Sequence, residues 1–369
     1  MPADMSFYCP ACQTPVDENA YRCPQCASPI EYVSSDAPTF PRADITARPA
    51  DMWRYAEALP TFAHRVSLGE PMTPLVPFDQ DGFTALAKCE YLMPTGSYKD
   101  RGAALLTSFL VGRNIDEAVE DSSGNAGAAL AAYAARGGLK LKVFCPASAS
   151  PGKLAQIRLY GAELVPIDGP RPRATEALIE YAAEHAVPYA SHLWHPLFTE
   201  GIKTLAYEIA EQDAWQAPDA ILCPVGAGSI LRGLYRGFKD LVAAGTVERI
   251  PRLVAVQSEH VSPLYRAFHD GAEDVVAAEN PQKTLAEGIA LPRPVRDREA
   301  LVAVHESGGT VIAVSEANIE VGISELGRRG FCVEPTSAVV WNGLHQYRRL
   351  EKLDDAKVVA VLSGHGLKA

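Results

Sequence analysis

The chain of 369 residues lacks an apolar run long enough to cross a bilayer, although 47% of its residues are hydrophobic. Residues 1–8 contain neither the basic region nor the apolar core of a secretory signal. We therefore expect a cytoplasmic protein with no membrane partner. Basic residues are also scarce, 34 against 45 acidic ones, so the net charge is −11. Because nucleic-acid binding depends on neutralising phosphates with Lys and Arg, this balance argues against a nucleic-acid partner.

Internal repeats, low-complexity tracts, a Walker motif and the longer dinucleotide-binding glycine pattern are all missing from the sequence. These absences exclude repeat architectures and leave no fingerprint for a nucleotide. The charged fraction of 21% is that of an ordinary globular protein. Since single cores stop growing near roughly 250–300 residues, the length predicts more than one domain.

Four of the eight cysteines form two close pairs. Cys9 and Cys12 make the first pair, Cys23 and Cys26 make the second, and a proline follows the first cysteine of each. This spacing presents four sulfur atoms to one metal, as in closed tetrahedral zinc sites. Disulfide bonds are the alternative, but the thiols of a cytoplasmic chain stay reduced. The sequence therefore predicts a four-cysteine zinc ribbon over residues 1–35.

The ribbon does not have the charge of a nucleic-acid-binding module. Residues 1–35 contain four acidic residues against Arg22 alone, a net charge of −3. We expect a structural module, or a docking or oligomer contact, followed by a Pro-, Ser- and Asp-rich linker over residues 34–50. The other four cysteines stand alone in apolar contexts and are expected to be buried thiols: Cys89, Cys145, Cys223 and Cys332.

After the linker, short β-like runs alternate with segments of helical periodicity. Alternation of this kind predicts βα units and an α/β fold with mainly parallel sheets covered by helices. The predicted strands are residues 83–91, 117–121, 139–145, 163–167, 220–224, 253–257, 310–314 and 357–362.

Lys99 lies in the polar run 94–102, between the predicted strand 83–91 and a predicted helix over 103–111. This position puts its amine at the mouth of a βα turn, where it can reach a ligand at the carboxyl edge of a sheet. A lone lysine in such a turn is more often a solvated charge. Its interpretation therefore depends on the other turns of the chain.

Three further turns follow the predicted strands. Residues 121–127 bring hydroxyl, amide and backbone N–H groups to one helix N-terminus, which suits a carboxylate, although a plain helix cap has the same composition. Residues 223–230 contain two glycines that let backbone amides approach a phosphate, and without a nucleotide pattern they indicate a smaller phosphorylated cofactor. Residues 362–368 place the hydroxyl of Ser363 at the end of the last strand.

Taken together and in this order, the four turns resemble the threonine synthase branch of the fold-type II (tryptophan synthase beta-like) pyridoxal-phosphate (PLP) enzymes. The resemblance covers residues 60–369, and chains of this branch often begin with a cysteine ribbon. It implies a two-domain PLP fold, a small amino-acid substrate and a homodimer. The implied domains are the ribbon over 1–35, a large PLP domain over 36–100 and 191–369, and a small mobile domain over 101–190.

The resemblance also implies roles for individual residues. Lys99 would be the catalytic residue, bonded to PLP as a Schiff base and later the base that removes the α-proton. Asn125 would contact the 3-hydroxyl of PLP, and Ser363 would face its pyridine nitrogen. Since a hydroxyl supplies no negative charge, the ring would be a weak electron sink, which favours elimination or replacement over transamination. The phosphate would be held by Gly226, Ala227, Gly228 and Ser229, and the substrate carboxylate by Ser122, Ser123, Gly124 and Ala126.

In residues 191–204 the chain departs from the pattern of the phosphohomoserine-using synthases, which argues against phosphohomoserine as the substrate. His195 takes the place of an Asn and Phe198 the place of an Arg that would suit a substrate phosphate. His195 is a candidate substrate-binding residue, or Arg232 replaces the missing Arg. Packing of His195 against Trp194 is the alternative.

Three functions stay open. The first is a threonine synthase-like lyase that converts O-phospho-L-homoserine to threonine and phosphate. The second is a related PLP enzyme of β-elimination or β-replacement, such as an ammonia-lyase, a serine or threonine dehydratase or a cysteate synthase-like enzyme. The third is a non-catalytic scaffold that uses its ribbon to bind partners.

Overall fold

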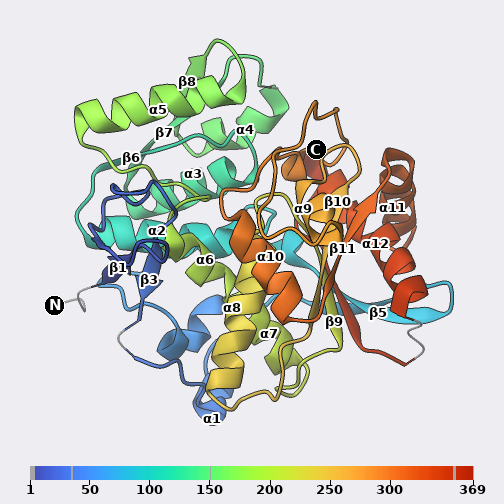
Figure 1. The fold of residues 1–369 in the computed structure, drawn as a ribbon. Helices are drawn as coiled ribbons and strands as arrows, with labels where there is room; N and C mark the ends of the chain where they lie inside the picture. Colours follow the sequence, from blue (N-terminus) through green and yellow to red (C-terminus); the bar gives the residue numbers. More distant parts are fainter. Residues whose placement is uncertain (1–4, 35, 150, 352–354, 369) are drawn as a thin grey trace. The chain divides into compact units, whose positions relative to one another are not determined.

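A computed structural model describes residues 5–34, 36–149, 151–351 and 355–368 (Figure 1). The chain divides into two compact units, which are described separately. Unit 1 comprises residues 1–37, 56–70 and 99–201, and unit 2 comprises residues 38–55, 71–98 and 202–369. In the part of the chain that is described, no helix has the length and apolar character needed to cross a membrane. The domain boundaries expected from the sequence stay a prediction.

Unit 2 is built on a six-stranded sheet with the strand order β11-β10-β9-β12-β5-β4. All neighbouring strands are parallel except β4 and β5, which form an antiparallel pair. The central strands β9 and β12 are buried along their whole length, as expected where helices cover both faces. The strands are β4 (Leu75–Gln80), β5 (Phe83–Lys88), β9 (Ala220–Pro224), β10 (Arg252–Ser258), β11 (Thr310–Val314) and β12 (Val358–Val361).

Helices flank this sheet on both sides (Figure 1), with α12 packed on β9, β10 and β11, and α8 packed on β9 and β10. The helices of unit 2 are α1 (Arg42–Ala47), α7 (Thr204–Gln212), α8 (Ser229–Ala243), α9 (Pro263–His269), α10 (Asp297–Glu306), α11 (Glu316–Arg328) and α12 (Pro335–Glu351). Short 3-10 helices cover Met52–Ala58, which runs into unit 1, Glu90–Leu92, Glu287–Ile289 and Gly366–Lys368.

Unit 1 contains two small sheets. One is parallel, with the order β6-β7-β8, and α5 and α3 cover its two faces (Figure 1). The other is the antiparallel sheet β2-β1-β3 of the ribbon. The elements are β1 (Ser6–Tyr8), β2 (Pro15–Val16), β3 (Glu31–Val33), α2 (Lys99–Gly112), β6 (Glu117–Glu120), α3 (Asn125–Gly137), β7 (Lys140–Pro146), α4 (Pro151–Leu159), β8 (Glu163–Ile167), α5 (Arg171–His185) and α6 (Pro196–Ile202), the last residue of which belongs to unit 2.

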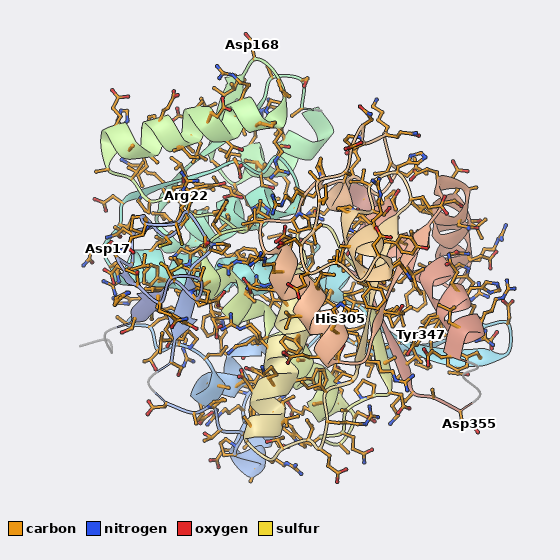
Figure 2. All side chains as sticks on the ribbon, in the orientation of Figure 1. Asp17, Arg22, Asp168, His305, Tyr347 and Asp355 are labelled. Atoms are coloured by element: carbon orange, nitrogen blue, oxygen red, sulfur yellow. The ribbon has the colours of Figure 1, made fainter. Side chains whose placement is uncertain are left out.

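The structure confirms the predicted α/β class with mainly parallel sheets, and it corrects several details. Strand β5 ends at Lys88, and a 3-10 helix follows where the sequence predicted three more strand residues. The predicted helix over 103–111 begins earlier, at Lys99, and Asn125 and Ser229 are the first residues of α3 and α8. Cys332 is exposed rather than buried, because it lies in the segment that connects α11 to α12 and not in a buried strand. Asp168, which follows β8, is one of the exposed charged side chains (Figure 2).

Candidate active site and metal centre

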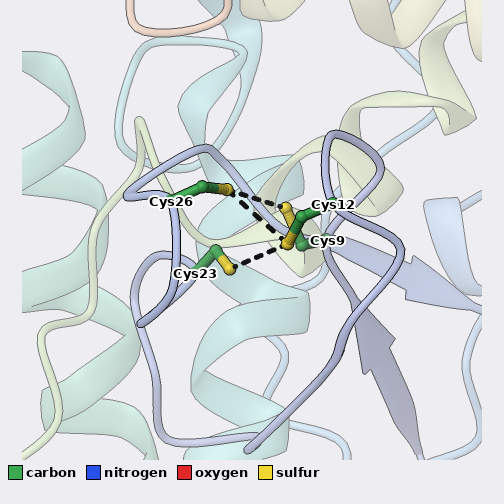
Figure 3. Close-up of side chains that lie close together, drawn as sticks. All are labelled: Cys9, Cys12, Cys23 and Cys26. Atoms are coloured by element: carbon green, nitrogen blue, oxygen red, sulfur yellow. Dashed lines mark hydrogen bonds between the residues drawn. The ribbon is translucent and has the colours of Figure 1, made fainter.

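The four ribbon cysteines meet at one point (Figure 3). The Sγ atoms of Cys9 and Cys26 are 3.5 Å apart, those of Cys12 and Cys23 are 3.5 Å apart, and those of Cys12 and Cys26 are 3.7 Å apart. Four thiolates about 2.3 Å from a tetrahedral zinc ion have this spacing. All eight cysteines of the chain are free thiols. The cluster therefore fits a metal and does not support the disulfide alternative.

The thiols of Cys9 and Cys26 differ in their surroundings and therefore in their pKa values. Burial raises the pKa of Cys9 to about 12. Hydrogen bonds from Ser28 lower the pKa of Cys26 to about 6. A metal ion would remove the remaining thiol protons, since only the thiolate is a ligand, so that metal affinity should rise with pH.

Aromatic side chains of the ribbon contact one segment of unit 1. Phe7 lies two residues before Cys9, and its ring is 6.0 Å from that of His195. Tyr21 lies two residues before Cys23, and its ring is 5.5 Å from that of Tyr189 and 5.8 Å from that of Trp194. Each cysteine pair therefore carries one aromatic ring that contacts residues 189–195. A salt bridge between Glu18 and Arg113, the residue that follows α2, adds to this interface.

Lys99 is partly buried at the beginning of α2, beside an aromatic ring. Its Nζ atom lies 5.6 Å from the centre of the Phe198 ring, which is fully buried. A Cβ atom on Gly102, one turn further along the helix, would come within 2.4 Å of the same ring. Only glycine at position 102 lets Phe198 pack against the first turn of α2. The Phe198 ring therefore excludes water from one side of the Lys99 amine.

The predicted carboxylate loop forms the N-terminus of α3. Ser122, Ser123, Gly124 and Ala126 lie together there, and the backbone N–H of Gly124 donates to Ser122 Oγ at 3.3 Å. A Cβ atom on Gly127 would come within 1.8 Å of the Ser122 carbonyl oxygen, so the loop folds tightly onto the first helical turn. The residues at the beginning of α3, a 13-residue helix, are partly exposed. Their backbone N–H groups stand at the positive end of the helix, which suits an anion.

The glycine-rich turn leads from β9 into the 15-residue helix α8. Gly228 has a φ of 80°, in the left-handed region that favours glycine. A Cβ atom on Gly226 would lie 2.7 Å from the Cα of Ile289, so this backbone closely approaches another. The hydroxyl of Ser229, the first residue of α8, is 2.8 Å from Tyr98 Oη. The turn and the half-buried Ala227 form a cradle at a helix N-terminus that fits a phosphate group.

Tyr98 connects this cradle to the last strand. Its backbone N–H donates to the Ser363 carbonyl at 3.1 Å, while its hydroxyl bonds Ser229. Lys99 follows Tyr98 directly in the sequence. The sequence did not single out Tyr98, although its place beside the predicted lysine was a signal for it.

Ser363 is almost fully buried, and its surroundings add a carboxylate that sequence reasoning missed. Its Oγ is 3.0 Å from Ser337 Oγ and donates to Glu334 Oε1 at 3.4 Å. Glu334 lies 29 residues before Ser363, and only the fold brings the two together. The hydroxyl predicted to face the pyridine nitrogen of PLP is therefore hydrogen-bonded to a carboxyl group.

His195 lies between aromatic rings. Its side chain is 7% exposed, its ring is 5.4 Å from that of Phe109, and its Nδ1 atom accepts from the backbone N–H of Leu197 at 3.3 Å. Trp194 turns toward Tyr21 instead. These contacts favour a packing role for His195. Its ring packs against Phe7 and Phe109 rather than against Trp194, the partner that the sequence suggested.

A second titratable cluster was not predicted. His192 Nδ1 lies 2.5 Å from Glu120 Oε1, at the end of β6. Burial raises the pKa of Glu120 and lowers the pKa of His192, so that the imidazole is neutral at neutral pH. Asp121 Oδ2 accepts from Thr175 Oγ1 at 2.6 Å. Two acids at a strand end were visible in the sequence, but the approach of His192 depends on the fold.

We expect Gly226→Ala to weaken cofactor binding, because the added Cβ atom would force the phosphate cradle away from Ile289. Retention of PLP should fall at least about tenfold, the effect of about 1.4 kcal/mol. Gly327→Ala is the control, since nothing lies within 4 Å of a Cβ atom at that helical position. Equilibrium dialysis against PLP measures both variants, and equal retention by the two would contradict the cradle.

Comparison with known proteins agrees with this geometry. The family model for pyridoxal-phosphate dependent enzymes matches residues 66–364. Threonine synthase of Methanocaldococcus jannaschii is 34% identical over 331 residues, which are 87% of this chain and 81% of that protein. Threonine synthase of Methanosarcina acetivorans is 34% identical over 325 residues, covering 86% and 80%.

Among solved structures, the threonine deaminase of T.th. is similar, with a TM-score of 0.70 and 27% identity over 88% of this chain and 97% of that one. The predicted fold type and the prediction of a threonine synthase-like PLP lyase, rather than a non-catalytic scaffold, are confirmed. The chain belongs to the family of pyridoxal-phosphate-dependent enzymes.

Proposed function

We propose that the protein converts O-phospho-L-homoserine to threonine and phosphate by elimination followed by replacement with water. The observation that carries this proposal is the position of Lys99 directly after Tyr98. The hydroxyl of Tyr98 bonds Ser229, and its backbone N–H donates to the Ser363 carbonyl. The similarity to threonine synthases over more than four-fifths of the chain supports the reaction. As the family requires, bound PLP would supply the electron sink for carbanion chemistry.

Different residues of the chain would hold the cofactor, move the proton and bind the substrate. Gly226, Ala227, Gly228 and Ser229 would hold the cofactor phosphate, and Asn125 and Ser363 would orient its ring. Lys99 would bond to the cofactor, and its released amine would remove the proton from the substrate Cα. Phe198 shields that amine from water on one side. The N-terminus of α3, with Ser122, Ser123, Gly124 and Ala126, would hold the substrate carboxylate.

We also propose that the ribbon cysteines hold one Zn²⁺ ion and that the substrate is a small amino acid. The spacing of the four sulfur atoms supports the metal. The homodimer, the mobile small domain and the cytoplasmic location stay predictions.

A second candidate function is β-elimination or β-replacement on an amino acid without a phosphate. Two observations favour it. The apolar ring of Phe198 lies beside Lys99 where an Arg would suit a phosphate, and the acidic pair of Glu120 and Asp121 immediately precedes the carboxylate loop. A phosphate dianion is poorly matched by an apolar ring and two carboxylates.

A substrate panel on PLP-loaded protein separates the two functions. With O-phospho-L-homoserine, we expect phosphate and threonine to appear in equal amounts. Serine, threonine and diaminopropionate serve as the other substrates, with 2-oxo acid and ammonia as their products. Products from this second group alone would reject the first function, and the Lys99→Ala variant reports the background of each assay.

A further inference from the structure

Three buried oxygen atoms without a hydrogen-bond partner belong to neighbouring residues of unit 1. They are Glu120 Oε2, Asp121 Oδ1 and Tyr189 Oη. Glu120 ends β6, Asp121 follows it, and Tyr189 forms a bridge with Val119 of the same strand. Their side chains are only 0%, 3% and 5% exposed. Because buried polar atoms are normally bonded, three such atoms in one place indicate a ligand.

His192 completes the group. One ligand atom of Glu120, one of Asp121 and one of His192 all lie within 4.8 Å of one another. The charges of Asp121 and Glu120 reach the phenol of Tyr189, which places its hydroxyl at the same cluster. The donor set is therefore two carboxyl groups and an imidazole, with a phenol nearby.

The positive charges of Arg171 and Lys99 act on the cluster. The guanidinium of Arg171 lies 4.0 Å from Asp121 Oδ1, and its side chain is 45% exposed. The charge of Lys99 also acts on Glu120 and on His192 from a longer distance. Each of the two buried carboxyl groups keeps one oxygen atom without a hydrogen-bond partner, which favours the binding of a cation.

We propose that Glu120, Asp121 and His192 bind one divalent first-row transition metal ion such as Mn²⁺. Carboxylate oxygens with one imidazole nitrogen suit such an ion, whereas Ca²⁺ prefers six to eight oxygens. The nearly complete burial of the ligands favours a small ion over the ammonium group of a substrate. Since Asp121 directly precedes Ser122, the ion would fix the beginning of the loop assigned to the substrate carboxylate.

Calorimetric titration of the chelator-treated holoenzyme with Mn²⁺ alone tests this site. Mn²⁺ prefers oxygen and nitrogen ligands, so it should leave the sulfur atoms of the ribbon alone. We expect one Mn²⁺ per chain, with at least tenfold weaker binding in Asp121→Asn and in His192→Gln. Glu117→Gln, on the same strand but outside the cluster, is the control and should bind as the unmodified chain does.

The titration also shows whether the proposal is wrong. No binding by the unmodified chain at millimolar Mn²⁺, or unchanged binding in both cluster variants, overturns it. Circular dichroism melting identifies a variant that fails to fold. In that case the test rests on Mn²⁺ binding by the unmodified chain and by the other variant. The readout is heat of binding rather than turnover, so the result does not depend on the proposed substrate.

Discussion

Lys99→Ala is expected to abolish turnover, with a loss of at least about 1000-fold, because one amine serves both as the anchor of the cofactor and as the base. The variant should keep its fold, since alanine is also favourable in the first turn of α2. The absorbance in the violet region that comes from PLP bonded to a lysine should disappear. Borohydride reduction followed by peptide mass spectrometry should label Lys99 in the unmodified protein and nothing in the variant.

The matched control is Lys140→Ala, which removes an exposed lysine of the same unit. It should keep both the absorbance and the activity. Turnover retained by Lys99→Ala, or a borohydride label on another lysine, would contradict the assignment. Melting temperatures of the two variants separate loss of chemistry from loss of folding.

The sequence predicted best those features that are encoded locally. Gly226 and Gly228 were recognised as a phosphate turn because close backbone approach and a positive φ require glycine within a few residues of a strand end. The buried strands β9 and β12 were recognised because sheets covered on both faces give continuous apolar runs. Strand β4 was missed, since it is a half-exposed edge strand that contains Pro77.

Features that depend on distant segments were not predictable. Lys88 looks like a surface charge at the end of β5, yet it is fully buried and 2.7 Å from the equally buried Glu208 of α7. In the same way, the pairing of His192 with Glu120 and of Ser363 with Glu334 joins residues 72 and 29 positions apart. Nothing in the local pattern of either partner identifies the other.

Loss of the ribbon metal is expected to loosen residues 189–195 as well as the ribbon itself. The metal would hold both cysteine pairs, and each pair positions one of the two rings, Phe7 and Tyr21, that pack on the rest of unit 1. Aromatic contacts contribute about 0.5–1.5 kcal/mol each, so losing four of them should cost about 4 kcal/mol. At about 2–4 °C per kcal/mol, the melting transition of unit 1 should fall by about 10 °C.

Cys26→Ser is the informative variant, because this exposed cysteine loses a metal ligand without leaving a cavity. Cys332→Ser removes another exposed cysteine outside the ribbon and is its control. We expect only Cys26→Ser to lose zinc in elemental analysis and to exchange amide hydrogens faster in residues 189–195. Zinc loss with unchanged exchange there would separate the ribbon from this segment. Faster exchange would instead connect the metal to His192, His195 and, two residues into α6, Phe198 beside the catalytic amine.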